Sequence, residues 1–263
     1  MTTRENFHGF ININKDSGPT STFLVSSIKK LFNGINRVGH CGTLDPMATG
    51  VLPICVGQAT RLSEFFLLTR KKYKVTGKFG SSTDTYDSLG KVTQKSNIYV
   101  SGEELAKALN SFSGIINQRP PLFSALKYKG ERLYKIARRG EKYIPPDRKV
   151  KVFNIDLVKY DFPEFQLDIR VSSGFYVRSL IHDLGTMLGC GSHMVALERT
   201  AVGDFNLSQS VTLKHFSNLV KKGNWKPKIV PIDYVLKDLP RIIMTSEQTK
   251  QVKNGVNISL SKV

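Results

Sequence analysis

The chain has 263 residues, a length that allows one large domain or two modest ones around a sizeable buried core. Its 39 Lys and Arg against 21 Asp and Glu leave a formal charge of +18, and such a surplus favours a polyanionic partner, above all nucleic acid. A membrane surface is the weaker alternative, because no apolar stretch approaches the roughly 20 residues that span a bilayer and no polybasic amphipathic helix stands out. A lysine-rich proteome would produce the same surplus, so motifs must decide between the two explanations.

Cysteine and histidine usage argues against a disulfide framework and against a metal site. Cys41, Cys55 and Cys190 are odd in number and lack CxxC spacing, and no His/Asn partner pattern supports a nucleophilic thiol at Cys41. The five histidines form no recognisable ligand pattern, so we expect no metal ion. Residues 1–8 contain no apolar core, and we therefore expect no signal peptide and a cytoplasmic protein.

The first expected elements are a strand and an amphipathic helix. Residues 9–14 read as a short strand, followed by turn-forming residues 16–19. A helix then begins near Thr20 or Ser21, because the next apolar residues recur at helical spacing and form one buried face. Gly34 is expected to end this helix.

Residues 37–61 form the most unusual segment. They are dense in Gly, Pro and Thr and yet contain the apolar run 51–56, which predicts a loop that leads straight into a buried strand. Residues 73–79 alternate like a half-buried strand. Residues 101–104 form a capping box, which predicts the start of a further helix.

Residues 117–150 are basic, contain paired prolines and look like a loop. Tyr128, Tyr134 and Tyr143 lie among the Lys and Arg of this segment. Aromatic side chains among cations can stack on unpaired bases, which would suit an excursion over a phosphate backbone. The composition fits a solvated loop with a few packing tyrosines equally well.

The remaining pattern indicates an α+β fold. Residues 152–158 and 165–171 read as two further strands, and residues 180–188 have helical spacing, with Gly189 in position to end that helix. Strands and helices that mix without regular βαβ alternation predict a mixed, largely antiparallel central sheet flanked by helices and loops. Near the C-terminus, residues 245–253 are expected to form a short helix.

One carboxylate stands out within residues 37–53, RVGHCGTLDPMATGVLP. The three glycines of this segment allow unusual backbone dihedrals or a close approach to a ligand. Pro46 restricts Asp45 to extended conformations, so that the carboxylate is presented from a rigid loop. Without the surrounding pattern, an Asp-Pro pair would indicate only a plain turn.

Residues 39–53 resemble the signature loop of the TruB family of RNA pseudouridine synthases, which also includes the dyskerin-like synthases. Further matches stand in the same order along the chain, at Lys15 and at residues 17–21, 57–62, 72–73, 80–87, 120–127, 137–140 and 174–180. The resemblance covers about residues 9–202 and implies a pseudouridine synthase fold. It also implies an isomerase that needs no cofactor, because the conversion of uridine to pseudouridine balances without redox or metal chemistry.

The resemblance implies three catalytic residues. Asp45 matches the catalytic aspartate, which acts at C1′ of the ribose or on the base while the uracil is detached, turned and rejoined through C5. Tyr73 matches the tyrosine that stacks on the target base, and Arg178 matches the arginine that pairs with the aspartate. Taken alone, Tyr73 would be a core strand residue and Arg178 a solvent-facing arginine.

Four further residues match positions that contact the substrate in this family. His40 matches a histidine that helps to bind or flip the nucleotide, Tyr176 matches a second pocket aromatic, and Leu197 matches an apolar residue that lines the base pocket. Arg61 stands where many bacterial relatives carry lysine, a change that keeps the local role. Without the motif, His40, Tyr176 and Leu197 would each indicate a structural position.

The resemblance also implies the partner and the domain plan. The expected substrate is the T-arm stem-loop of transfer RNA, with the uridine at position 55 turned out of its stack. Residues 1–238 would form the catalytic domain, in which residues 120–150 are a thumb-like insertion that closes over the RNA. Residues 239–263 would form a short, partial PUA-like segment, since related enzymes carry a longer module there. We expect a monomer with no obligate protein partner.

Two other interpretations fit parts of the sequence. A non-catalytic RNA-binding protein or tRNA-folding chaperone could keep the fold without the reaction, although the set of Asp45, Tyr73 and Arg178 favours the enzyme. A hydrolase could use Asp45 with Asp84 or Asp87 as a carboxylate pair, as glycosidases do. The residues around Asp84 and Asp87 read more simply as a turn.

The positive charge predicts a steep dependence of RNA affinity on salt. Lys and Arg that neutralise phosphates release counterions, so the affinity for transfer RNA should fall roughly 1000-fold between about 50 and about 200 mM salt. Fluorescence titrations at several salt concentrations measure this slope. A flat response would contradict the phosphate-binding interpretation of the +18 charge.

Overall fold

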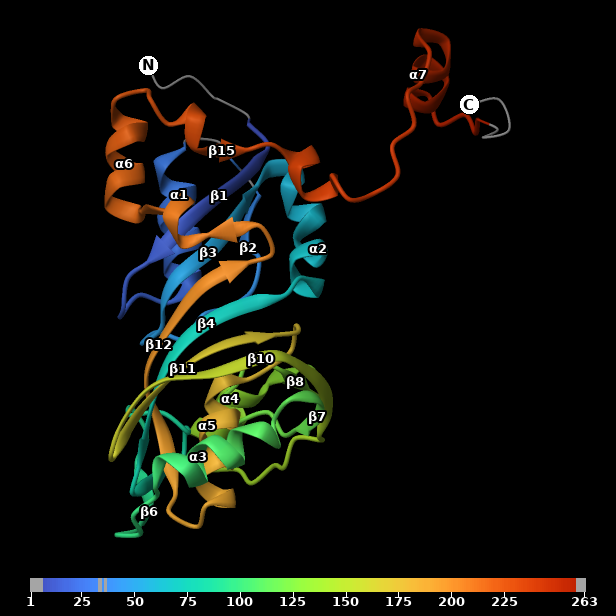
Figure 1. Ribbon diagram of the computed structural model, residues 1–263. Coiled ribbons are helices and arrows are strands. Elements are labelled where there is room, and N and C mark those ends of the chain that lie inside the picture. Colours follow the sequence, from blue (N-terminus) through green and yellow to red (C-terminus); the bar gives the residue numbers. More distant parts are fainter. Residues whose placement is uncertain (1–6, 33–34, 36, 259–263) are drawn as a thin grey trace. The chain divides into compact units, whose positions relative to one another are not determined.

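A mixed sheet, eleven-stranded in the described residues, organises the first of two compact units (Figure 1). The computed structural model describes residues 7–32, 35 and 37–258, and the two units are Met1–Pro231 and Ile232–Val263. The main path of the sheet is, in spatial order, β14 (Val211–Thr212), β1 (Gly9–Lys15), β3 (Thr49–Val56), β12 (Ser192–Val202), β4 (Lys71–Phe79), β11 (Glu164–Val171), β10 (Arg148–Asp161) and β7 (Gly114–Gln118).

Short strands extend this path and form two small hairpins. Off the main path, β2 (Val38–His40) pairs with β3, β13 (Phe205–Asn206) with β12, and β15 (Ile229–Val230) with β1. Separate two-stranded sheets are formed by β5 (Ser81–Thr83) with β6 (Val92–Lys95), and by β8 (Lys127–Tyr128) with β9 (Glu131–Arg132). Most neighbours are antiparallel, while β3 and β12 run parallel, as do β1 and β14. The expected α+β fold with a mixed, largely antiparallel sheet is confirmed.

The helices follow the local signals of the sequence. The α-helices are α1 (Ser21–Leu31), α2 (Ser63–Leu68), α3 (Gly102–Asn110), α4 (Leu133–Arg138), α5 (Val177–Met187), α6 (Leu213–Lys221) and α7 (Ser246–Lys253). Short 3-10 helices are η1 (Gly57–Leu62), η2 (Leu207–Gln209), η3 (Lys226–Lys228) and η4 (Ile232–Leu236). The side chain of Thr20 caps α1, and the predicted capping box of Ser101 and Glu104 begins α3. Gly34, expected to end α1, lies outside the described residues.

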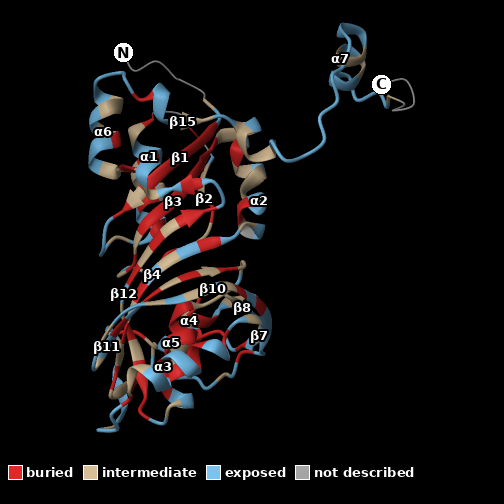
Figure 2. Cartoon of the chain, viewed as in Figure 1, coloured by how far each residue is buried: buried red, intermediate tan, exposed pale blue. Residues whose placement is uncertain are grey.

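The core lies between the sheet and the helices that cover it. Helices α3 and α5 pack against one face of β4, β10 and β12, while α1 and α6 pack together beside β1 and β2 (Figure 1). Burial follows the same plan, with red segments concentrated on the helix-covered parts of the strands (Figure 2). Along β11 the alternation is regular, because Phe165, Leu167, Ile169 and Val171 point inward and are almost fully buried.

The prediction of a loop over residues 117–150 was partly wrong. This basic segment, taken as residues 120–150, contains the β8–β9 hairpin and the helix α4. Leu133 and Ile136 are buried, so that two apolar side chains one turn apart hold this short helix against the protein. Tyr128 and Tyr143 stack on each other with ring centroids 4.2 Å apart, which favours packing as the role of these two tyrosines.

The strand β12 was not predicted from the sequence, although it lies at the centre of the sheet. Its register against β4 shifts twice, between Met194 and Ala196 and between Arg199 and Ala201. Such irregularities move side chains to the opposite face and break the two-residue alternation by which a strand is recognised. The sequence of β12 therefore lacks the regular alternation that would have predicted a strand.

The second unit contains η4 and α7, and α7 matches the helix expected over residues 245–253. Its first residue is Ile232, earlier than the boundary after residue 238 that the sequence suggested. None of the helices in the described part of the chain has the length and apolar character needed to cross a bilayer.

Gly50 lets two distant strands approach each other. It is the second residue of β3, with φ of +99°, and it pairs with Arg199 of β12 in the parallel register. A Cβ at this position would lie 2.3 Å from the Arg199 carbonyl oxygen and 2.9 Å from its backbone nitrogen. Only glycine satisfies both the positive φ and this backbone approach.

Replacing Gly50 by alanine should destabilise the first unit by more than the cost of placing alanine in a left-handed conformation. We expect Gly50→Ala to lower the free energy of unfolding by about 3 kcal/mol, because strained dihedrals and a backbone clash add. Gly18→Ala is the matched control, since Gly18 has φ of +105° with no atom within 4 Å of the added Cβ, and should cost about 1 kcal/mol. Urea unfolding of both variants measures the difference, and equal losses would contradict the close approach of β3 and β12.

Candidate active site

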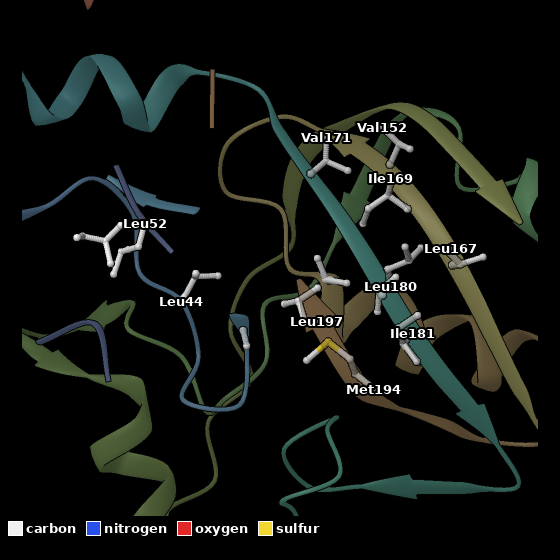
Figure 3. Close-up of a cluster of buried hydrophobic side chains, with 14 of the residues drawn as sticks. Leu44, Leu52, Val152, Leu167, Ile169, Val171, Leu180, Ile181, Met194 and Leu197 are labelled. Carbon is white, nitrogen blue, oxygen red and sulfur yellow. The ribbon is translucent and has the colours of Figure 1, made fainter. Parts of the chain in front are cut away.

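The loop between β2 and β3, residues 41–48, presents Asp45 from a buried anchor. The hydroxyl of Ser21, at the start of α1, accepts a hydrogen bond from the Leu44 amide (2.9 Å) and donates one to the Leu44 carbonyl (3.1 Å). The side chain of Leu44 belongs to the hydrophobic core (Figure 3). Asp45, the next residue, keeps 33% of its side chain exposed. The backbone is therefore fixed from inside while the carboxylate remains accessible.

Lys15 holds the loop from the end of β1. Its side chain is buried, and its ammonium group donates hydrogen bonds to the carbonyl oxygens of Asp16 (3.0 Å), Pro46 (2.9 Å) and Ala48 (2.6 Å). Burial lowers the pKa of Lys15 to about 8, while the nearby Asp45 carboxylate acts in the opposite direction. One ammonium group thus fixes the backbone that directly follows Asp45.

Arg199 holds the same loop from β12. Its side chain is only 2% exposed, and its guanidinium donates to the carbonyl oxygens of Val51 (2.7 Å), Thr43 (3.3 Å) and Gly42 (3.1 Å). Lys15 and Arg199 together therefore hold the backbone before and after Asp45. Sequence reasoning missed Arg199, because the irregular register of β12 hides which of its residues point inward.

Arg178, on the first turn of α5, forms the central contact of the site. Its guanidinium meets the Asp45 carboxylate with two nitrogens, at 2.9 Å for Nε to Oδ2 and 3.2 Å for Nη2 to Oδ1. It also donates to the carbonyl oxygens of Thr85 (2.8 Å) and Phe123 (2.9 Å), and its Nη1 lies 3.6 Å from Oδ2 of Asp87. With 6% of its side chain exposed, Arg178 is a buried cation whose position is set by several partners.

A cavity of about 620 Å³ opens over this ion pair. Asp45, Tyr73, Tyr176, Arg178 and Leu197, five residues expected at the site from the sequence, all line it. The remaining walls come from residues 42–44, Leu68, Lys71, residues 124–126, Arg132, residues 172–175, Val177 and Arg199. Elements that are far apart in the sequence therefore meet around one carboxylate.

Aromatic and apolar side chains form the wall of the cavity that faces the ion pair. Tyr73 is half-buried on β4, and Leu197 on β12 is 7% exposed (Figure 3). The backbone of Tyr176 is held by Gln118, which accepts from the Tyr176 amide (2.8 Å) and donates to its carbonyl (3.0 Å). Burial raises the pKa of the Tyr176 hydroxyl. A planar base could be received between these side chains and the carboxylate.

His40 and Arg61 do not line this cavity. His40 ends β2, and burial lowers the pKa of its imidazole, with the nearby guanidinium of Arg199 acting in the same direction. Its Nδ1 atom is buried without a hydrogen-bond partner among the described residues. Arg61 lies in η1 with an exposed side chain.

The carboxylate pair of a hydrolase does not form. Asp87 contacts the guanidinium of Arg178, which also binds Asp45, so that an arginine is bracketed by two carboxylates. Asp84 is exposed and accepts a hydrogen bond from the Lys91 amide (2.8 Å). Two carboxyl groups facing a common open space, as glycosidases require, are therefore not found at Asp45 and these two residues.

The structure also bears on a metal site and on a nucleophilic cysteine. Within residues 7–32, 35 and 37–258, no three His, Cys, Asp or Glu side chains are grouped so that they could hold a metal ion. Cys41 is buried, and its hydrogen bond with Cys55 together with burial raises the pKa of its thiol. A raised pKa disfavours the thiolate that a nucleophilic cysteine needs.

Comparison with known protein families places this site in a class. Residues 29–177 match the model described as TruB family pseudouridylate synthase (N terminal domain). Residues 178–243 match the model described as tRNA pseudouridylate synthase B C-terminal domain. The fold and the site together define a pseudouridine synthase.

Individual relatives and solved structures agree with that class. The tRNA pseudouridine synthase B of Clostridium kluyveri is 38% identical over 250 residues, covering 95% of this chain and 85% of the relative. That of Vibrio atlanticus is 35% identical, covering 97% and 83%. The structure of a Cbf5-Nop10-Gar1 complex contains a chain that superposes with a TM-score of 0.74 at 29% identity, covering 95% of this chain and 68% of that one. The chain belongs to the TruB family and is an isomerase that makes pseudouridine.

The burial of Lys15 predicts a pH dependence of stability. Because its pKa is about 8 in the folded protein and higher in the unfolded chain, the unfolded state binds more protons above pH 8. The free energy of unfolding of the natural protein should therefore rise relative to Lys15→Met as the pH increases from 8 to about 10, by on the order of 2 kcal/mol. Urea unfolding at several pH values measures the difference.

Lys29→Met is the control for this measurement, because Lys29 is exposed on α1. Its stability relative to the natural protein should not change over the same pH range. A Lys15→Met difference that stays constant or shrinks as the pH rises would contradict the lowered pKa.

Proposed function

We propose that this enzyme isomerises a uridine in the T-loop of transfer RNA, at position 55. Membership of the TruB family and the name of its similar relatives, tRNA pseudouridine synthase B, support transfer RNA as the substrate. The likeness of residues 39–53 to the family's signature loop supports the position within the RNA. The charge of +18 is complementary to such a substrate.

The main support for the proposal is the position of the Asp45 carboxylate, which is held by Arg178 and still accessible. Its carboxylate is held by two nitrogens of a buried guanidinium, and yet a third of its side chain faces the cavity. A carboxylate fixed in this way loses little orientational freedom when substrate arrives, and it would stabilise positive charge that develops on a ribose bound in the cavity.

The proposed reaction breaks one bond of the uracil to the ribose and forms another. The bond between N1 of uracil and C1′ breaks, and Asp45 stabilises or captures the sugar while the base is detached. The uracil turns and forms a bond from C5 to C1′, after which the hydrogen on C5 is lost as a proton and N1 gains one. The sum is an isomerisation, so atoms and electrons balance without any added reactant.

The walls of the cavity fit the remaining roles. Tyr73 would stack on the target base and assist removal of the C5 proton, while Tyr176 and Leu197 complete the pocket for the uracil. Arg178 would orient Asp45 throughout the reaction. His40 and Arg61, which lie outside the cavity lining, would contact the RNA around the target nucleotide and help to turn it out.

The basic segment, residues 120–150, would close over the RNA. It already contributes residues 124–126 and Arg132 to the cavity, so the catalytic site and the RNA-binding surface are continuous. Phe123, just before that wall, accepts a hydrogen bond from Arg178. We expect the protein to act as a monomer without an obligate protein partner.

Replacement of Asp45 tests the proposal. Asp45→Asn should reduce the rate of pseudouridine formation by at least about 1000-fold, because the amide keeps the shape but neither carries charge nor attacks carbon. Release of tritium from transfer RNA labelled at C5 of uridine measures the rate, and chemical mapping locates the product. Asp84→Asn is the matched control, since Asp84 is an exposed carboxylate, and it should retain activity.

The same variant separates the enzyme from the alternative, a tRNA-folding chaperone. A chaperone would fold misfolded transfer RNA equally well with Asn at position 45, and the natural protein would release no tritium. Product at a position outside the T-loop would overturn the assigned position and leave the chemistry intact.

A further inference from the structure

The partners of Arg178 on the side away from Asp45 lie on one short loop. Residues 83–89 provide the Thr85 carbonyl, at 2.8 Å from Nη1, and the carboxylate of Asp87, at 3.6 Å. Asp87 is in turn fixed by the hydroxyl of Thr85 (2.7 Å) and the amide of Leu89 (3.1 Å). The direction of the guanidinium thus depends on the position of this loop.

Tyr86 stands at the centre of the loop in an unusual conformation. Its φ is +64°, which is in the left-handed region that side chains other than glycine rarely adopt. Its carbonyl accepts a hydrogen bond from the amide of Met194 on β12 (3.0 Å). A non-glycine residue kept in this conformation indicates that its side chain is needed there, because glycine would satisfy the backbone without strain.

The side chain of Tyr86 stacks on His182. The ring centroids are 3.8 Å apart and the ring planes differ by 8°. His182 follows Arg178 by one turn of α5, so that it shares a face of the helix with the arginine. Both rings are half-buried, and burial lowers the pKa of His182, which favours the neutral imidazole in the stack.

We propose that Tyr86 and His182 are a positioning pair that sets the guanidinium of Arg178 against Asp45. The stack joins α5, which carries Arg178, to the loop that carries Thr85 and Asp87. It thereby fixes the distance between the guanidinium and the oxygens of Thr85 and Asp87 that contact it. This inference rests on the proposed roles of Asp45 and Arg178 in the reaction. Neither Tyr86 nor His182 lines the cavity, so both act through Arg178 and not on the substrate.

The pair Tyr86→Gly and Tyr86→Phe separates the ring from the backbone. Glycine accepts the positive φ and removes the ring, whereas phenylalanine keeps the ring and the strain. Tyr86→Gly should slow single-turnover isomerisation at saturating transfer RNA by about tenfold, with an unchanged dissociation constant for the RNA. Tyr86→Phe should stay within about twofold of the natural enzyme. Rate and affinity are measured by tritium release and fluorescence titration below the melting temperature of each variant.

The partner residue supplies an independent measurement. His182→Ala should slow the reaction as Tyr86→Gly does, His182→Phe should restore most of the rate, and the double variant Tyr86→Gly, His182→Ala should be no slower than either single variant. Tyr99→Gly is the control, because the Tyr99 ring packs at a tilt against Phe162 with centroids 4.9 Å apart, in an aromatic contact that does not involve Arg178. It should leave the rate unchanged.

Several outcomes would overturn the positioning role. They are a natural rate for Tyr86→Gly, an equal loss for Tyr86→Phe, or a weakened RNA affinity with an unchanged rate. Should Tyr86→Gly fail to fold, the comparison of His182→Ala with His182→Phe decides, and equal rates for these two variants would reject the proposal. Asp45→Asn, measured alongside, keeps the two questions apart, since an active Asp45→Asn rejects the proposed function and an inactive one leaves only the stack to be judged.

Discussion

The proposed active site depends on the burial of one guanidinium. Arg178 joins the loop that carries Asp45, the loop of residues 83–89 and the start of the basic segment through direct hydrogen bonds or ion pairs. A buried cation is stable only while its partners are in place, and removing one of them leaves an uncompensated charge or carbonyl. These contacts stabilise one relative arrangement of the three segments, the one in which Asp45 lines the cavity.

Two further buried cations act on the backbone of the same loop. Lys15 and Arg199 each donate three hydrogen bonds to carbonyl oxygens, two of which in each case belong to residues 41–48. Carbonyl groups satisfy the donors but, unlike carboxylates, do not cancel their charge. The loop is therefore rigid and lies in a positive electrostatic potential. Both properties suit the proposed site, where a carboxylate must remain fixed beside an anionic RNA backbone.

The predictable parts of the fold are those determined by local physical chemistry. The caps at Thr20 and Ser101 and the alternation along β11 act within a few residues, so the corresponding elements could be predicted. The helix α4 was missed, because its six residues present only two buried side chains to a periodicity search. The strand β12 was missed because its irregular register removes that periodicity.

The candidate site divides in the same way. Asp45 could be singled out, since Pro46 and the surrounding glycines mark a rigid loop, and the resemblance to a known family pointed to Tyr73 and Arg178. The support from Arg199 was not predictable, because it depends on a strand pairing that joins residues about 150 positions apart. The place of Asp87 behind Arg178 depends on the left-handed backbone next to it, which no sequence pattern announces.

The parallel pairing of β3 with β12 joins residues that the ribosome makes at widely separated times. Asp45 leaves the ribosome early, but the guanidinium groups of Arg178 and Arg199 are made much later, and Gly50 cannot find its strand partner until then. A nascent chain therefore carries Asp45 through most of translation without the two guanidinium groups that hold it and its loop. The proposed site can therefore form only after β12 has been made and inserted between β3 and β4, late in the synthesis of the first unit.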